Sequence, residues 1–177
     1  MIERNIEIII EDTIKHYPIT LVTGPRQIGK STLLYNSFLN KGYTYISLDD
    51  SLEYAMAKSD PKTFLELHRA PLIIDEAQKA PELFPELEKI VNESRLKKGN
   101  KESNGLYILS GSQRQKLLDE SKESLSGRVA ILDMSNLSLS EINNRNNIPF
   151  TVNLNSISLR INDYYIDETQ AFKYIVR

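Results

Sequence analysis

Residues 19–31 read Ile-Thr-Leu-Val-Thr-Gly-Pro-Arg-Gln-Ile-Gly-Lys-Ser, an apolar and β-branched run that passes into a glycine-rich turn. The apolar run is typical of a buried strand. The turn, from Gly24 to Ser31, fits the pattern G-x-x-x-x-G-K-[ST], and a helical stripe begins directly after it at Lys30. Strand, turn and helix in this order predict a loop that holds phosphate groups with backbone N–H groups and a helix N-terminus.

The residues of this loop are expected to have distinct roles. The residues expected to bind the nucleotide are Gly24, Pro25, Arg26, Gln27, Ile28, Gly29, Lys30, Ser31 and Thr32. We expect Lys30 to reach the β- and γ-phosphates and the hydroxyl of Ser31 to bind Mg²⁺. The alternative is a glycine-rich turn that only caps a helix, and the strand before the turn makes that alternative the weaker one.

Two adjacent carboxylates, Asp75 and Glu76, follow the most apolar strand candidate, Leu72 to Ile74. In an α/β sheet the loops at the carboxyl ends of the strands form the ligand crevice. This is a Walker B pattern, in which Asp75 is expected to hold Mg²⁺ through its water shell and Glu76 to act as general base on an attacking water. Taken alone, the pair would be ordinary polarity at a strand end. Together with the phosphate loop, it favours hydrolysis.

Three further residues are candidates for the catalytic machinery. Ser112 and Gln113 follow the next strand, where a hydroxyl or an amide could orient the attacking water if that strand lies beside the first one. A serine-rich turn with a helix cap is the alternative for this segment. Arg128 opens the last strand and could supply positive charge in cis or to a neighbouring subunit, as could Arg114. A lone surface arginine is the alternative.

The element pattern predicts an α/β fold with a doubly wound, mostly parallel sheet and helices on both faces. Helices are expected at residues 2–16, 30–40, 60–67, 85–98 and 113–123, and strands at 19–23, 43–48, 72–74, 106–109 and 129–132. The strand at 72–74 is apolar at consecutive positions, as central strands covered on both faces are.

Composition excludes several classes of protein. The chain has 177 residues, 40% of them hydrophobic, and no cysteine, so neither a disulfide framework nor a thiolate zinc site can form. Its net charge of −2 gives no basic field for nucleic acid, and the lysine-rich stretch 96–104 is interpreted as a solvated loop. No apolar run approaches the ~20 residues of a membrane span. A cytoplasmic protein that does not cross a membrane is therefore expected.

Several motifs, in order, resemble those of prokaryotic AAA+ superfamily ATPases of the Gly-Pro-Arg-Gln type. They are Thr-Gly-Pro-Arg-Gln-Ile-Gly-Lys-Ser from Thr23, Tyr-Ile-Ser-Leu-Asp-Asp from Tyr45, Ile-Asp-Glu-Ala-Gln-Lys-Ala-Pro-Glu-Leu-Phe from Ile74, Tyr-Ile-Leu-Ser-Gly-Ser-Gln from Tyr107, Ser-Leu-Ser-Gly-Arg-Val from Ser124 and Leu-Ser-Leu-Ser-Glu from Leu137. The resemblance covers about residues 1–142.

The resemblance implies a P-loop ATPase core over residues 1–142, ATP as the nucleotide, and a five-stranded sheet in the order 5-1-4-3-2. It makes Ser112 and Gln113 candidate sensor residues, with Gln113 the better match although the family usually has asparagine there, and Arg128 a candidate arginine finger. Such proteins usually continue into a restriction-nuclease-like domain. Residues 143–177 are therefore expected to be a linker and the start of a truncated segment.

The function expected from these residues is Mg²⁺-dependent ATP hydrolysis, coupled to an unknown partner or to nucleic acid. One alternative is a nucleotide-gated binding module with little turnover, although Glu76 argues against a pure switch. A small-molecule kinase shares the phosphate loop but would need an arginine-rich lid. A GTPase is disfavoured because the guanine signature Asn-Lys-x-Asp does not occur. ATP and ADP are the expected ligands, with self-association or a protein partner left open.

Overall fold

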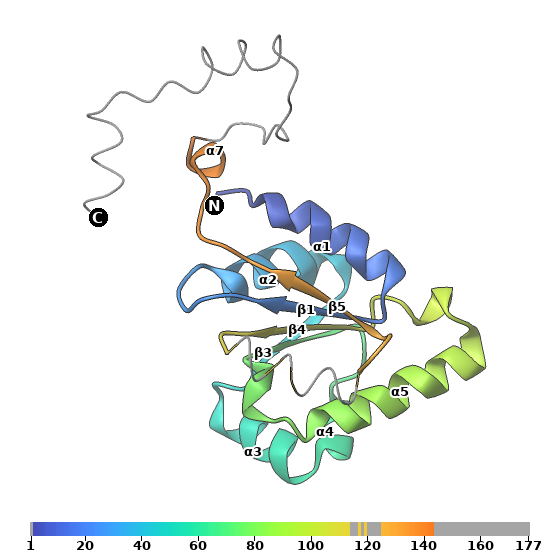
Figure 1. The fold of residues 1–177 in the computed structure, drawn as a ribbon. Helices are drawn as coiled ribbons and strands as arrows, with labels where there is room; N and C mark the ends of the chain where they lie inside the picture. The colour runs from blue at the N-terminus through green and yellow to red at the C-terminus, as the bar shows by residue number, and fades with distance from the viewer. Residues whose placement is uncertain (1, 114–116, 118, 120–124, 144–177) are drawn as a thin grey trace. The chain divides into compact units, whose positions relative to one another are not determined.

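The fold is a parallel five-stranded sheet between two layers of helices (Figure 1). The structure is a computed structural model and describes residues 2–113, 117, 119 and 125–143. The main elements it describes are α1 (Asn5–His16), β1 (Ile19–Thr23), α2 (Lys30–Phe38), β2 (Thr44–Ser47), α3 (Ser51–Ser59), α4 (Pro61–Leu67), β3 (Leu72–Asp75), α5 (Leu83–Lys98), β4 (Tyr107–Gly111), β5 (Val129–Asp133) and α7 (Leu139–Ile142). Short 3₁₀ helices lie at Leu39–Lys41, Ala77–Lys79 and Lys101–Ser103.

The strand order is β2-β3-β4-β1-β5, which confirms the predicted order 5-1-4-3-2. β4 therefore lies between the phosphate-loop strand β1 and the Asp75 strand β3. All neighbouring strands are parallel, and Thr23 at the end of β1 pairs with Gly111 of β4 and with Asp133 of β5. The carboxyl ends of β1, β3 and β4 consequently meet at one edge of the sheet, where the loops that follow them lie close together.

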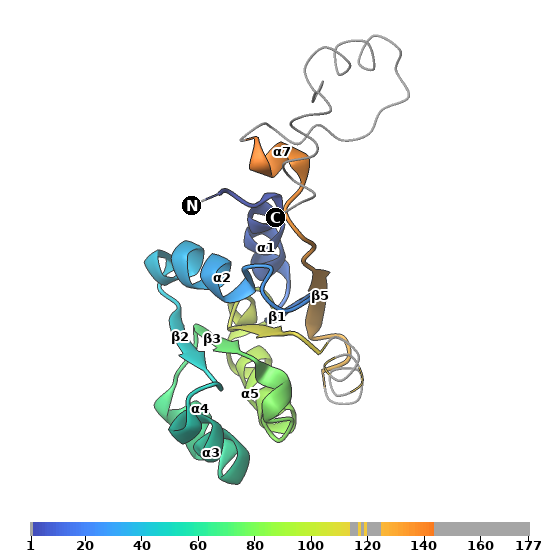
Figure 2. The same ribbon diagram turned by 90° about the vertical axis from the view of Figure 1, so that its left-hand side faces the viewer.

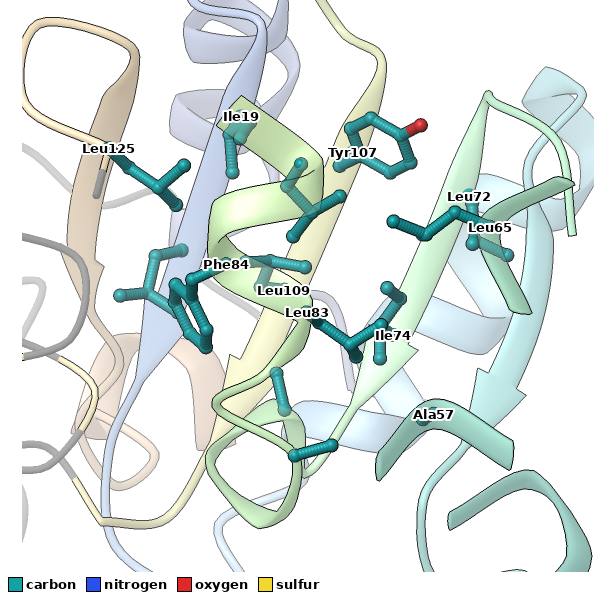
Figure 3. Close-up of a cluster of buried hydrophobic side chains, with 14 of the residues drawn as sticks. Ile19, Ala57, Leu65, Leu72, Ile74, Leu83, Phe84, Tyr107, Leu109 and Leu125 are labelled. Carbon is teal, nitrogen blue, oxygen red and sulfur yellow. The ribbon is translucent and has the colours of Figure 1, made fainter. Parts of the chain in front are cut away.

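The alternation of side chains along the strands produces a core on each face of the sheet. Ile19 and Leu21 of β1 belong to the core under α3, α4 and α5, which Figure 3 shows with Leu83 and Phe84 of α5 packed toward the sheet. Val22, the next residue of β1, belongs to the other core, which α1 and α2 cover. Figure 2 shows the two helical layers from a second direction. The central strands β1, β3 and β4 are thus buried on both sides, as predicted for residues 72–74, whereas the edge strands β2 and β5 are partly exposed.

The element boundaries differ from the prediction in ways that have local causes. α1 begins at Asn5 rather than residue 2, because Arg4 is extended, with φ −110° and ψ 128°. α5 begins at Leu83, so that Pro85 lies in the first turn, where the missing N–H group leaves no hydrogen bond unmade. α3 was not predicted at all, although the side chain of Asp50 caps it by accepting hydrogen bonds from the N–H groups of Leu52 and Glu53.

Some predictions concern residues that the structure does not describe. Most of the helix expected at 113–123, and all of residues 144–177 with the predicted linker, lie outside the described residues. The domain boundary near residue 142 therefore stays a prediction. Within the stretch predicted as a solvated loop, residues 96–102 are exposed, but residues 96–98 belong to α5 and Ser103 is fully buried. None of the described helices has the length and apolar character needed to cross a membrane.

Candidate active site

A cavity of about 600 Å³ opens at the carboxyl edge of the sheet, where the loops after β1, β3 and β4 meet. The residues that line it are Arg26, Gln27, Gly29, Lys30, Ser31, Thr32, Asp49, Glu76, Gln78, Lys79 and Gln113. The structure thus brings most of the predicted phosphate loop together with Glu76 and Gln113, which lie far from it in the sequence.

The backbone of the phosphate loop depends on its two glycines. Gly24 has φ +151°, and a Cβ atom there would lie 2.3 Å from the backbone oxygen of Met134. Gly29 has φ +91° and stands directly before α2, whose first N–H groups have no partner within the helix. The loop therefore turns tightly around the helix N-terminus, as anion binding requires.

Lys30 is almost fully buried, with 5% of its surface exposed. Its Nζ donates hydrogen bonds to the carbonyl oxygens of Gly24 at 2.8 Å and Pro25 at 2.7 Å. Burial lowers the pKa of Lys30 below its usual value, and the negative charges of Glu76 and Asp75 partly offset that effect. The ammonium group is therefore poorly solvated in the loop, so an anion placed beside it would interact strongly.

Asp75 is the meeting point of three hydroxyl groups. Its Oδ2 accepts hydrogen bonds from Ser31 Oγ and from Tyr45 Oη, both at 2.7 Å, and its Oδ1 accepts one from Ser110 Oγ. Burial, followed by the hydrogen bond to Asp75, raises the pKa of Tyr45, so its hydroxyl stays protonated as a donor. The pairing of Ser31 with Asp75 supplies adjacent oxygen ligands of the kind that Mg²⁺ prefers, so the donor set fits this ion.

Glu76 adopts the left-handed backbone conformation, with φ +57°, which is uncommon for a residue with a side chain. Its Oε2 accepts hydrogen bonds from Ser112 Oγ at 3.1 Å and from Gln78 Nε2. Strained backbone of this kind is concentrated at functional sites. Glu76 and Gln113 thus line the cavity, and Ser112 lies next to it through its hydrogen bond to Glu76.

Arg128 is not at the cavity. It precedes β5, and Val129 pairs with Ile19 at the start of β1, so Arg128 lies about 16 Å along the sheet from the phosphate loop. Its guanidinium group binds Asn92 Oδ1 at 2.8 Å and Glu88 Oε1 at 3.2 Å. The structure therefore does not bring Arg128 to the phosphate loop in cis, because parallel strands start at the edge opposite the loop. A role toward a neighbouring subunit stays a prediction, and Arg114 lies outside the described residues.

Residues 16–143, most of the chain, match the family described as AAA domain. The chain belongs to the AAA domain family. Two relatives of this AAA domain are uncharacterized protein Rv2008c of Mycobacterium tuberculosis and uncharacterized protein Mb2031c of Mycobacterium bovis, each 30% identical over 160 residues. The alignment covers 84% of this chain and 34% of each relative, so the chain spans about a third of their length.

Two solved structures are similar to this chain over part of their length. The Walker-type ATPase PABY2304 of Pyrococcus abyssi has a TM-score of 0.48 with 21% identity, covering 75% of this chain and 54% of that one. The AMPPCP-bound DnaA of Aquifex aeolicus has a TM-score of 0.46 with 17% identity, covering 93% of this chain and 53% of that one.

Sequence reasoning assigned no role to five polar residues of the AAA domain's site. Tyr45 and Ser110 bind Asp75, Gln78 binds Glu76, and Lys79 binds Asp49 beside the cavity. For Ser110, a serine in the otherwise apolar strand β4 was the available signal. The sequence contains no comparable signal for Tyr45, because its contact with Asp75 depends on the pairing of β2 with β3.

Arg4 connects the phosphate loop of the AAA domain to the segment after β5. Its guanidinium group binds Glu141 Oε1 at 3.1 Å, the carbonyl oxygen of Ile28 at 2.9 Å and that of Ser135 at 2.7 Å. The Arg4 and Glu141 side chains are 9% and 7% exposed. Burial alone would raise the pKa of Glu141, but hydrogen bonds from Ser138, Asn5 and Arg4 more than offset this, and the pKa lies below its usual value.

Arg4→Ala is expected to lower the free energy of unfolding by about 3 kcal/mol at pH 7, because it leaves a buried carboxylate without its cation. The matched control is Lys97→Ala, which breaks an exposed pair with Glu93 (72% and 66% exposed) and should cost at most about 0.5 kcal/mol.

The lowered pKa of Glu141 stabilises the fold at pH values above the pKa of the unfolded chain, and this stabilisation disappears as the pH falls through the folded-state value. Glu141→Gln should therefore flatten the acid limb of stability against pH. Urea unfolding measures both effects, and equal costs for Arg4→Ala and Lys97→Ala would contradict the first.

Proposed function

We propose that this AAA domain binds ATP together with Mg²⁺ and hydrolyses it. The observation that carries the proposal is the position of Glu76, which lies one residue beyond Asp75 and lines the same cavity as Lys30 and Ser31. A loop that only held a nucleotide would not need a carboxylate at this place, whereas hydrolysis requires a group that accepts a proton from water.

The residues of the cavity suit the separate tasks of this reaction. The N–H groups of the loop from Gly24 to Thr32, together with Lys30, would hold the phosphates, and Lys30 would exchange its two carbonyl partners for phosphate oxygens. Ser31 and Asp75 would hold the Mg²⁺ ion. When bound, that ion supplies positive charge to the β- and γ-phosphates. Ser112 and Gln113 would sense the γ-phosphate from the end of β4.

The hydrolytic step needs one base. Glu76 accepts a proton from the attacking water while the water oxygen forms a bond to the γ-phosphorus. The bond between that phosphorus and the bridging oxygen breaks, and ADP and inorganic phosphate are the products. Glu76 then returns the proton to solvent or to a product.

A second pocket supports a place for the base of the nucleotide. It has a volume of about 210 Å³ and shares Gly29 and Thr32 with the larger cavity. The residues that line it are Ile2, Arg4, Ile28, Gly29, Thr32, Leu33 and Leu137. Apolar walls suit the faces of a purine ring, so we propose this pocket as the base site, with adenine as the expected base.

This chain spans about a third of the length of its relatives, so the process that ATP hydrolysis drives depends on the longer protein. We propose that turnover acts on a protein partner, on a second copy of the chain or on nucleic acid through the parts outside residues 16–143. A nucleotide-gated binding module is the second candidate, and it is supported by the hydrogen bonds that join the phosphate loop to Ser135 and Glu141 through Arg4.

Glu76→Gln tests the proposal, because it keeps the shape of the side chain and removes its ability to accept a proton. We expect the rate of phosphate release from Mg²⁺-ATP to fall about a hundredfold, while the dissociation constant of Mg²⁺-ADP changes less than about threefold. Glu82→Gln, at an exposed position next to α5, serves as the matched control and should not change the rate. Equal rates for wild type and Glu76→Gln would refute the general-base role. Tight ATP binding without hydrolysis by the wild type would favour the binding module.

A further inference from the structure

Gln78 is a buried polar residue at the cavity that the proposed mechanism does not use. It lies in the 3₁₀ helix Ala77–Lys79, two residues after Glu76, and only 3% of its surface is exposed. It nevertheless lines the cavity beside Glu76 and Gln113. A glutamine is seldom buried to this extent unless its amide has a partner that needs it.

The side-chain amide of Gln78 is hydrogen-bonded to Glu76. Its Nε2 donates a hydrogen bond to Glu76 Oε2, the same oxygen that accepts from Ser112 Oγ. Two donors on one carboxylate oxygen, one from the residue after β4 and one from the 3₁₀ helix, fix the rotation of the carboxylate as well as its position. The left-handed backbone of Glu76 starts the turn that brings Gln78 back beside it.

The other end of the amide is unsatisfied. Among the described residues, no hydrogen-bond partner reaches the buried Oε1 of Gln78. A buried acceptor without a partner costs free energy, which an apolar side chain of the same size would avoid. The Oε1 atom of Gln78 therefore adds nothing to stability, and the group that a glutamine supplies at this position is the Nε2 donor bonded to Glu76.

The end of β4 is shaped to admit this amide. At Gly111, the Cβ atom of any other residue would lie 2.1 Å from Gln78 Oε1 and 2.4 Å from a methyl group of Leu117. Gly111 is not at a positive φ, so its lack of a side chain is needed for space rather than for backbone conformation. The last residue of β4, just before Ser112, thus leaves room for the side chain that bonds to Glu76.

We propose that Gln78 is a positioning residue for Glu76, which keeps the carboxylate turned toward the attacking water. The inference rests on the proposed hydrolysis and goes beyond it, because it assigns the orientation of the base to a residue outside the phosphate loop, the carboxylate pair and the sensor positions. Gln78 acts through Glu76 and needs no contact with the nucleotide.

The test uses Gln78→Met, which has nearly the same volume and cannot donate a hydrogen bond. We expect the single-turnover rate of Mg²⁺-ATP hydrolysis to fall about tenfold, the dissociation constant of Mg²⁺-ADP to stay within twofold, and Tm to stay the same or rise. Gln78→Glu, which keeps the shape but replaces the donor with a second carboxylate, should lower the rate at least as much. In a Glu76→Gln background, Gln78→Met should have no further effect, because the base it positions is already lost.

The outcomes separate this inference from the proposal it rests on. A Gln78→Met rate equal to that of the wild type would overturn it. An equal loss of rate in both backgrounds, or a loss that follows a lowered Tm, would show a merely structural role and would overturn it as well. Absence of hydrolysis by the wild type would instead overturn the proposed function, and the inference with it.

Discussion

Lys30→Met is expected to weaken binding of Mg²⁺-ATP at least about thirtyfold, because removal of one charge from a desolvated pair costs about 2–5 kcal/mol. Lys30 is 5% exposed, and burial already lowers its pKa, so its interaction with a phosphate is little screened by water. Methionine fills similar space without the charge. Isothermal titration calorimetry at fixed Mg²⁺ measures the change.

Lys62→Met is the control for this variant, since Lys62 is a surface residue whose side chain is 74% exposed and lies 3.9 Å from Glu66. It should leave nucleotide affinity unchanged. The Tm of nucleotide-free Lys30→Met should stay within a few degrees of wild type, because the hydrogen bonds of Lys30 to other described residues go to two loop carbonyls. Unchanged ATP affinity in a folded Lys30→Met protein would contradict the assignment of this loop.

Gly24→Ala is expected to lower the free energy of unfolding by about 3–5 kcal/mol, through backbone strain and steric overlap together. The added methyl group would lie 2.3 Å from the oxygen of Met134, a backbone atom that cannot rotate away as a side chain could. The N–H group of Met134 in turn donates to the oxygen of Thr23, so a shift of Met134 would disturb the end of β1. Urea denaturation gives the cost, and nucleotide binding should be lost as well.

Gly42→Ala isolates the backbone part of that cost. Gly42 also has a positive φ, +89°, but no atom lies within 4 Å of the position its Cβ would take. It should therefore lose only about 1–2 kcal/mol, the cost of the left-handed conformation. If the two variants lost the same stability, steric contact with Met134 would not be the cause of the Gly24 requirement.

The sheet and the meeting of the phosphate loop with Asp75 could be predicted because both follow from local sequence patterns. Apolar runs separated by helical stripes identify parallel strands, and parallel strands bring their carboxyl ends to one edge. The meeting of Ser31 with Asp75 follows from that rule alone. The same rule, applied to Arg128, would have excluded its role in cis, because this residue precedes a strand instead of following one.

Other features depend on side-chain directions that a pattern does not encode. Nothing in the sequence shows that Tyr45 turns its hydroxyl toward Asp75, or that Gln78 folds back onto Glu76. α3 was missed for a related reason: its residues carry no clear apolar stripe, and Leu52 is 78% exposed. Its helix is specified by the cap at Asp50 and by packing against the rest of the fold, in which Ala57 is fully buried.

The contacts of Arg4 have a mechanical consequence. One guanidinium group is bonded to the phosphate loop at Ile28, to the chain leaving β5 at Ser135, and to α7 at Glu141. If a bound triphosphate displaces the carbonyl of Ile28, Arg4 must either release it or pull on α7, the last helix before the chain continues past residue 143. One side chain thereby links the phosphate loop to α7, at the end of the described chain.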